Sequence, residues 1–281
     1  MDIKIPDTFM GKPVEGAIKR VLAMQKSKPK KTAKTSQKQI ILPNEDLQFI
    51  TDKSLYDEIK TYFAKTFPDK QEMFNELKWD SQNSVATGSN SYISTGVDMF
   101  FKKNMPKYRI ARQIDLETDL KKFKGFYIDS GLALRSLENP NQEKAKHIQK
   151  QLKQRGLNKF PVWMDLRGLE LDSNLNFNLT DESRYKQADC LNWKNETKYS
   201  QIDDFGLPKS KDKNSSRKIW TNKQGLSRCF LYWGSDLGSR YEGLAVSDGV
   251  GRVAFAKVRR CEAPELCAKN KTLKLNGYKK N

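Results

Sequence analysis

The segment from Gly225 to Lys257 constrains the fold of this 281-residue chain more than any other stretch. Apolar and small residues recur along it as a regular frame: Leu226, Leu231, Leu237, Leu244 with Ala245, and Gly251-Arg252-Val253. The residues between them share no period and are chemically mixed: Tyr232, Trp233, Ser235, Asp236, Arg240, Tyr241, Glu242 and Asp248. Residues of these types dominate the contact surfaces of binding proteins, because aromatic side chains supply contact area at low entropy cost. The pattern predicts a rigid apolar frame that presents these eight side chains as a ligand-binding surface.

The chain between residues 125 and 171 alternates between strand and helix patterns. Residues 126–134 predict a half-buried strand, because apolar residues alternate on one face: Phe126, Ile128, Leu132 and Leu134. The stretch 141–156 predicts an amphipathic helix that ends at Gly156, with three apolar residues turned inward: Ala145, Ile148 and Leu152. Residues 160–171 then predict a strand and a turn.

The remaining C-terminal sequence predicts loops followed by short strands. Long loops are expected over 172–217, held by aromatic anchors: Phe177, Tyr185, Trp193, Tyr199 and Phe205. Short strands are expected near 226–231, 244–247 and 252–258. This order of elements is an α+β fold, in which the last strand could pair with the strand at 126–134.

The N-terminal part has a different character. Residues 1–45 form a basic arm or linker that contains the lysine-rich stretch KSKPKKTAKTSQK. Residues 46–124 are expected to form a small helical module, with a first helix over 51–63 capped by Thr51 or Asp52. A second short helix is expected around Phe74, and residues 81–96 have a loop composition.

The C-terminal half resembles a known family. The stretches FYIDSGLALRS, PVWMDLRGLELD, DDFGLP and GLSRCFLYWGSDLGSRYEGLAVSDGVGRV are similar to the C-type-lectin-like variable domain of proteins diversified by diversity-generating retroelements. The resemblance implies a C-type-lectin-like domain over 125–260, followed by a basic tail at 261–281. The first 124 residues have no counterpart in that family.

The resemblance also implies that adenine-directed mutagenesis rewrites chosen codons while the apolar frame stays constant. Nine residues belong to the set that such mutagenesis reaches: Ser227, Cys229, Tyr232, Ser235, Asp236, Tyr241, Val246, Asp248 and Val250. Trp233 and Glu242 require other starting codons. On this basis the protein is expected to be a display protein that binds an unknown protein or surface ligand through 225–257.

The net charge of +18 suggests a second class of function. A strongly basic chain is attracted to polyanions, so a nucleic-acid-binding accessory protein of a mobile element is the alternative, with the basic arm as the contact. Lysines spread through every segment also fit a general surface preference. No apolar run approaches the roughly 20 residues of a membrane span, and the N-terminus lacks the order of a signal peptide. An intracellular or non-classically exported protein is therefore expected.

Catalytic and metal chemistry find little support in the sequence. The four cysteines form no CxxC pair and His147 is the single histidine, so no zinc site, other metal or cofactor is expected. Cys261 and Cys267 are compatible with a local disulfide in an oxidising compartment. Four acidic residues could converge as in a metal-dependent nuclease, although Asp165 is expected to face solvent: Asp129, Asp165, Glu170 and Asp172. No nucleophile, base and oxyanion donor assemble, so we expect a non-enzymatic protein without catalytic residues.

Overall fold

The computed structural model describes residues 8–9, 12–13, 47–239 and 243–258. The chain divides into two compact units, Met1–Ile40 and Ile41–Asn281. In the first unit, β1 (Thr8–Phe9) pairs with β2 (Lys12–Pro13) in an antiparallel ladder. The rest of the predicted arm, the predicted tail, and the predicted site residues Arg240, Tyr241 and Glu242 lie outside the described residues. So do Cys261 and Cys267.

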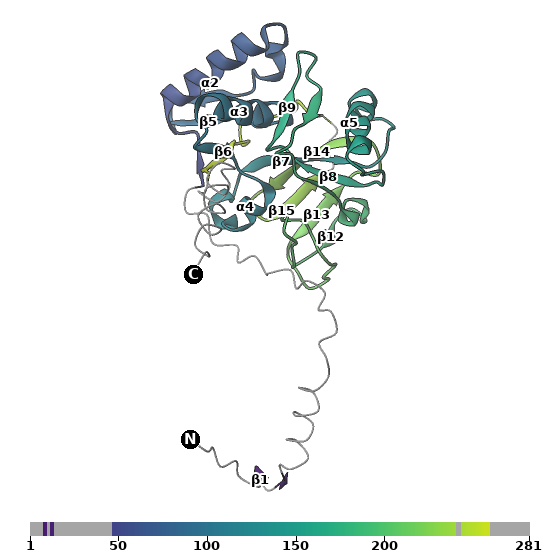
Figure 1. The fold of residues 1–281 in the computed structure, drawn as a ribbon. Coiled ribbons are helices and arrows are strands. Elements are labelled where there is room, and N and C mark those ends of the chain that lie inside the picture. The colour runs from purple at the N-terminus through teal and green to yellow at the C-terminus, as the bar shows by residue number, and fades with distance from the viewer. Residues whose placement is uncertain (1–7, 10–11, 14–46, 240–242, 259–281) are drawn as a thin grey trace, which may run out of the picture. The chain divides into compact units, whose positions relative to one another are not determined.

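The second unit combines helices and strands, so the predicted α+β class is confirmed (Figure 1). Its helices and 3₁₀ turns are α2 (Lys53–Thr66), η1 (Pro68–Met73), α3 (Ser91–Asn104), α4 (Gln113–Glu117), η2 (Leu120–Phe123), α5 (Gln142–Gln154) and η3 (Asp189–Asn192). The first strands are β3 (Gln48–Phe49), β4 (Lys78–Asp80), β5 (Val85–Thr87), β6 (Tyr108–Ile110), β7 (Tyr127–Leu134), β8 (Val162–Asp165) and β9 (Leu169–Leu171). They are followed by β10 (Phe177–Leu179), β11 (Tyr185–Gln187), β12 (Thr197–Lys198), β13 (Lys218–Thr221), β14 (Leu226–Tyr232), β15 (Asp236–Ser239) and β16 (Ala254–Lys257).

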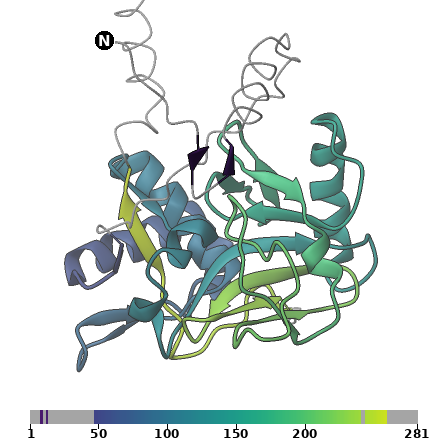
Figure 2. The ribbon, with the colours of Figure 1, turned by 90° about the horizontal axis from the view of Figure 1, so that it is seen from below.

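A curled seven-stranded sheet forms the centre of the described part of this unit, in the order β11-β8-β7-β14-β15-β13-β12 (Figure 2). Its neighbouring strands are antiparallel except β13 and β15, which are parallel. The pairing of β14 with β7 shifts register between Cys229 and Phe230, so that Gly131 faces Cys229 and Asp129 faces Phe230. This bulge leaves Ser130 without an opposing residue and adds to the local twist.

The last strand does not join this sheet. β16 lies between β3 and β6 in a separate three-stranded sheet, so the predicted pairing of the last strand with residues 126–134 is wrong. The partners of β7 are β8 and β14 instead. Before β16, an isolated parallel bridge from Gly251 to Tyr127 brings the chain beside β7. Strand pairing over such separations depends on the whole packing, which a local pattern cannot reveal.

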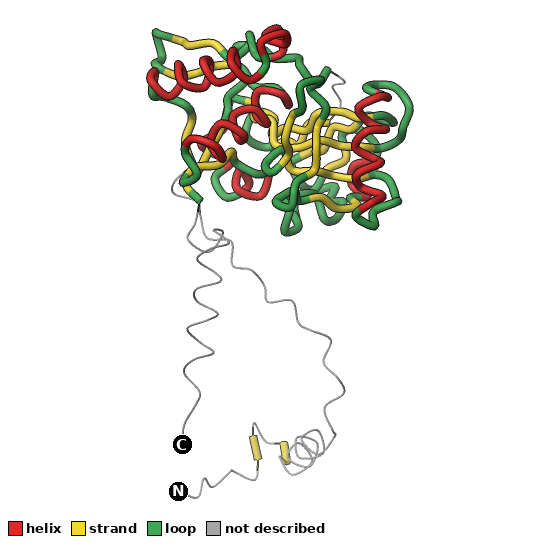
Figure 3. The backbone as a smooth tube through the Cα atoms, turned by 45° about the horizontal axis from the view of Figure 1, so that its top comes forward, coloured by secondary structure: helices red, strands yellow, loops and turns green. Residues whose placement is uncertain are grey.

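Two helices in the N-terminal part illustrate what local signals can and cannot predict. α2 begins after Asp52, whose side chain accepts a hydrogen bond from the Ser54 amide, as the sequence predicts. The predicted loop at 81–96 is wrong, because α3 starts at Ser91, with the Asn90 side chain capping the Ile93 amide. The start of α3 is polar but buried, so tertiary packing overrides its loop-like composition. Figure 3 shows α2 and α3 on one side of the central strands and α5 on the other in that view.

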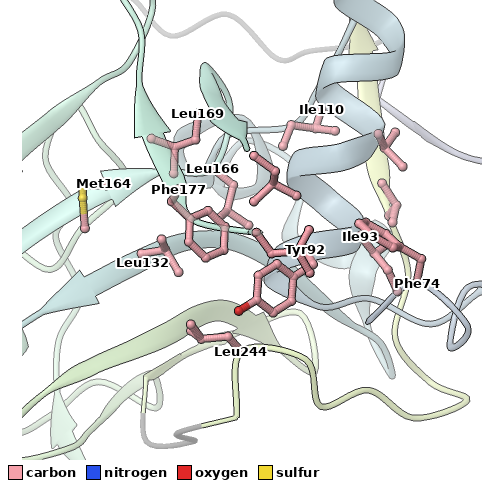
Figure 4. Close-up of a cluster of buried hydrophobic side chains, with 14 of the residues drawn as sticks. Phe74, Tyr92, Ile93, Ile110, Leu132, Met164, Leu166, Leu169, Phe177 and Leu244 are labelled. Atoms are coloured by element: carbon pink, nitrogen blue, oxygen red, sulfur yellow. The ribbon is translucent and has the colours of Figure 1, made fainter. Parts of the chain in front are cut away.

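One buried apolar cluster joins residues from both sides of position 125. Phe74 and Ile93 lie in it together with Leu132 and Phe177, as Figure 4 shows. The Tyr92 and Phe177 rings stack with centroids 5.2 Å apart. The described residues 47–124 therefore contribute directly to the core against the central sheet.

Helix α5 follows its predicted pattern, with Ala145, Ile148 and Leu152 buried. All eight residues of β7 are buried, however, so the predicted half-buried strand is wrong. The reason is a second apolar cluster, which covers the other face of the sheet and includes Trp163, Tyr199 and Leu237. A strand with both faces covered is buried throughout, whatever its alternation suggests.

Two details of the C-terminal strands also differ from expectation. The structure has no strand at 244–247, where residues 244–245 form a turn, and it has β15, which the sequence did not reveal. The region 172–217 contains the short strands β10, β11 and β12 besides its loops, with Phe177 and Tyr199 fully buried as anchors. In the described part of the chain, no helix has the length and apolar character needed to cross a bilayer.

Candidate recognition surface

The apolar frame of the segment 225–257 is internal. Its described leucines and valine are at most 3% exposed: Leu226, Leu231, Leu237, Leu244 and Val253. Leu244 joins the cluster that also holds Tyr92 (Figure 4). Burying side chains of this size stabilises the fold by roughly 1.5–3 kcal/mol each, so the frame holds the backbone of the segment in place.

One face of strands β13, β14 and β15 carries polar and aromatic side chains. Tyr232 pairs with Asp236 across β14 and β15, and Trp220 pairs with Gly238 across β13 and β15. Because side chains alternate along a strand, Lys218, Trp220, Tyr232 and Asp236 project to the same side. We call these four residues the β13–β15 face, and each of them is half-buried.

The Asp236 carboxylate links two other residues of this face by hydrogen bonds. Its Oδ2 accepts a hydrogen bond from Trp220 Nε1 at 3.2 Å, and its Oδ1 accepts one from the Lys218 amide at 3.0 Å. The Lys218 ammonium lies 5.3 Å from the centroid of the Trp220 ring, within range of a cation–π interaction. The face thus holds an oriented indole, an ammonium and a carboxylate.

The turn between β14 and β15 presents Trp233. Its side chain is 53% exposed, and its ring meets that of Tyr232 edge to face at 5.8 Å. The backbone of Trp233 is left-handed (φ 54°), which is unfavourable for a bulky residue. At Gly234, a Cβ would lie 2.7 Å from the Leu120 carbonyl oxygen, so the turn is pressed against η2. Strained backbone that carries an exposed aromatic side chain points to function and not to stability.

The loop 243–252 supplies the remaining exposed residues. Val246, Asp248 and Val250 are exposed, and the loop backbone is tied down between them. The Asp248 amide donates to the Tyr127 hydroxyl at 2.9 Å, and Ser247 Oγ accepts from the Ser89 amide at 2.8 Å. These bonds hold the loop in one position while its side chains face outward.

Tyr127 connects the loop to the strands. It is the register partner of Tyr232 on β14, and its hydroxyl contacts Ser247 and Asp248. The loop therefore lies at the same end of the sheet as Trp233.

A buried ion pair lies beneath the loop. The Arg228 guanidinium binds the Asp129 carboxylate through Nε at 2.8 Å and Nη2 at 2.7 Å, with both side chains at most 4% exposed. Arg228 Nη1 also donates to the Val246 carbonyl. One charged side chain from β14 thus ties the exposed loop to the core of the sheet.

The structure gathers some of the predicted site residues. Tyr232, Trp233, Ser235 and Asp236 are contiguous on the β14–β15 connection, and Asp248 reaches their end of the sheet through Tyr127. Ser227 and Cys229 belong to the nine residues that adenine-directed mutagenesis would reach. Both are fully buried, on the face of β14 opposite to Tyr232.

Sequence reasoning missed Trp220 and Lys218, which precede the segment 225–257. Alternation in KIWT, residues 218–221, is the one local signal for a strand there. Its proximity to Asp236 depends on the parallel pairing of β13 with β15, which the sequence does not show.

The acidic residues considered for a metal site do not converge. Asp129 pairs with Arg228, Glu170 pairs with Lys102 at 2.8 Å, and Asp172 caps the turn that contains Asn174. Within the described ranges, no group of three or more His, Cys, Asp or Glu residues is arranged to hold a metal ion.

Asp165 is the clearest departure from expectation, since it is fully buried and does not face solvent. It ends β8, where its Oδ1 accepts a hydrogen bond from Trp163 Nε1 at 3.0 Å. Its Oδ2 has no hydrogen-bond partner in the described part of the chain and lies 3.8 Å from Arg184 Nε and 4.0 Å from Arg112 Nε. Burial raises the pKa of Asp165 to about 6, although both guanidinium groups favour the charged form.

The raised pKa of Asp165 predicts that this residue contributes more to the free energy of unfolding at acidic pH than at neutral pH. Since folded Asp165 holds its proton to a higher pH than the unfolded chain does, its contribution to the free energy of unfolding falls as the pH rises from about 4 to about 6. The variant Asp165→Asn should lack this fall and be more stable than wild type at pH 7, by on the order of 2 kcal/mol. Urea unfolding of both proteins across this range measures the difference. A difference that does not change with pH would contradict the assignment.

Comparison with protein-family models, with curated proteins and with solved structures finds no match to this chain.

Proposed function

We propose that this protein is a non-enzymatic ligand-binding protein. Its recognition surface consists of the β13–β15 face, the exposed turn at Trp233 and the loop 243–252. One observation carries the proposal: in the described part of the chain, every exposed large hydrophobic residue lies in the segment 225–257. These are Trp233, Val246 and Val250, with exposed fractions of 53%, 58% and 42%.

Two further features support recognition as the role of this surface. Tryptophan and tyrosine are frequent energetic anchors of binding interfaces, because each buries a large area when a partner docks. Exposed Asp248 and the Asp236–Trp220 pair add polar groups that set orientation and charge preference. An exposed aromatic centre with a polar surround fits a folded protein or a surface-displayed ligand.

We further propose that the domain is a C-type-lectin-like domain diversified by a retroelement. The separation between a buried frame and exposed, chemically mixed residues supports this proposal, since diversification requires positions that can change without loss of the fold. The flanking DNA offers a direct test. We expect a near-copy of the coding sequence for 225–257, differing mainly at adenines, beside a reverse-transcriptase gene. Its absence would remove the retroelement part of the proposal and leave the binding surface standing.

The binding surface is tested by replacing its exposed residues together. The fourfold variant Trp233→Ser, Val246→Ser, Asp248→Ser and Val250→Ser should lose ligand binding and keep a melting temperature close to that of wild type, because exposed substitutions change stability by about 0.5 kcal/mol or less each. Ligands can be sought by selection from a displayed protein library. An alanine variant of Lys65, which is exposed on α2, is the control and should bind as wild type does.

If the fourfold variant unfolds, its residues belong to the core and the proposal fails. Unchanged binding by a folded variant would place the recognition surface elsewhere.

Binding of nucleic acid through the basic arm is the second candidate, which the net charge of +18 favours. Release of condensed counterions would make such binding fall steeply with salt concentration. A filter-binding assay at low salt tests it, and absence of DNA or RNA retention would exclude it. The two functions are compatible, since they use different parts of the chain.

A further inference from the structure

A second candidate site lies at the other end of the central sheet. A cleft of about 1230 Å³ opens where β7 and β13 end and β14 begins. β14 runs from Leu226, beside this cleft, to Tyr232, so the length of the strand separates the cleft from the exposed turn at Trp233. None of the residues that line the cleft belongs to the recognition surface.

The lining of the cleft is basic and polar. Its lining includes three cationic residues, Arg135, Lys194 and Lys223, and one aromatic wall, Trp193. The other lining residues are asparagine, glutamine, threonine and proline, and none of the lining residues in the described part of the chain is acidic. Such a lining offers mainly hydrogen-bond donors and positive charge.

Arg135 is the buried cation of this lining. It is 5% exposed, and its guanidinium donates to three neutral oxygens: Leu191 O at 2.8 Å, Ser227 Oγ at 2.7 Å and Ser239 Oγ at 2.7 Å. Among the described residues, no carboxylate pairs with it. A buried charge without a counter-charge is costly, so buried guanidinium groups are normally paired.

The electrostatic environment of Arg135 agrees with this geometry. Burial lowers the pKa of the Arg135 guanidinium. Three of the five guanidinium N–H donors are used by the three hydrogen bonds above. A further donor is available in the cleft lining, since Asn222 Nδ2 is buried and has no hydrogen-bond partner among the residues that the structure describes.

We propose that this cleft binds a phosphate or sulfate group. A tetrahedral oxyanion presents acceptors only, in several directions, and matches a site built from a guanidinium, an amide and two ammonium groups. It would also supply the counter-charge that Arg135 lacks. The volume exceeds that of a single inorganic ion, and Trp193 provides an apolar wall, so the ligand is an oxyanion carried on a sugar-sized polar group.

Isothermal titration calorimetry of the full chain at low ionic strength tests this proposal. The probes are inorganic phosphate, inorganic sulfate and a hexose phosphate. We expect saturable binding, tightest for the hexose phosphate, and equal affinity for inorganic phosphate would identify the free ion as the ligand instead. Lys223→Gln should weaken binding about tenfold. Asn222→Asp, which keeps the side-chain size and adds a negative charge, should abolish it.

Lys65→Gln on α2 is the matched control, because it removes the same charge from an exposed position that does not line the cleft. It should leave the affinity unchanged. Circular dichroism and melting temperatures establish that each variant is folded. The proposal is overturned if folded wild type shows no saturable binding of any probe. It is also overturned if Lys65→Gln weakens binding as much as Lys223→Gln does, since the attraction would then be general.

Discussion

Replacing Arg228 with alanine is expected to lower the free energy of unfolding by about 3–5 kcal/mol. The loss arises because the carboxyl group of Asp129, which is 2% exposed, would remain buried without its partner. The same change removes the donor to the Val246 carbonyl and so loosens the loop of the recognition surface, which keeps its hydrogen bonds to Ser89 and Tyr127. Urea unfolding measures the loss of stability. Faster amide hydrogen exchange over 243–251 than elsewhere would report release of the loop.

A double variant separates the two causes. Arg228→Met combined with Asp129→Leu removes both charges and keeps apolar volume, so it should lose less stability than Arg228→Ala alone. Arg155→Ala is the control, because Arg155 is exposed and its side chain makes one hydrogen bond to the described residues, to Leu179 O. It should cost no more than about 1 kcal/mol. If Arg228→Ala costs as little as this control, the ion pair does not anchor the loop.

Leu231→Ala and Trp233→Gly are expected to have opposite consequences, although these residues are two positions apart. Leu231 is fully buried, so its truncation should cost about 2–5 kcal/mol through lost burial and the cavity left behind. Trp233→Gly should leave the free energy of unfolding within about 1 kcal/mol of wild type. The lost contact with Tyr232 is offset because glycine adopts the left-handed backbone without strain.

Denaturant unfolding with an unchanged m-value is the measurement for both variants. Ligand binding should follow the reverse order, since Trp233→Gly removes an anchor of the recognition surface while folded Leu231→Ala keeps it. Comparable losses of stability in the two variants would mean that Trp233 is a core residue. The separation of the segment 225–257 into a buried apolar frame and an exposed recognition surface would then be wrong.

The contrast between α5 and α3 explains how much of the fold could be predicted. α5 has a clean amphipathic period and a glycine after its end, both of which are local signals. α3 begins with SYISTG, which has the composition of a loop, and it is helical because its surroundings bury every one of those residues. Local patterns predict elements well where only one side of the element is covered.

The candidate site divides in the same way. The spacing of leucines distinguishes Trp233 and Asp248 from the frame, and both side chains are exposed. Trp220 reaches Asp236 only because β13 pairs in parallel with β15, and no local pattern encodes that partner. The position of Arg135 among neutral oxygens depends on side chains from β14 and β15, more than 90 residues away in sequence.

The sequence by itself determined the α+β class, the frame of 225–257 and the basic character of the chain, because composition and short-range periodicity act within a few residues. The tertiary structure alone decided the partners of β16, the burial of Asp165 and the pairing of Arg228 with Asp129. These features join residues that are distant along the chain. Their energies depend on desolvation and on which charges meet, and both are set only when the sheet is assembled.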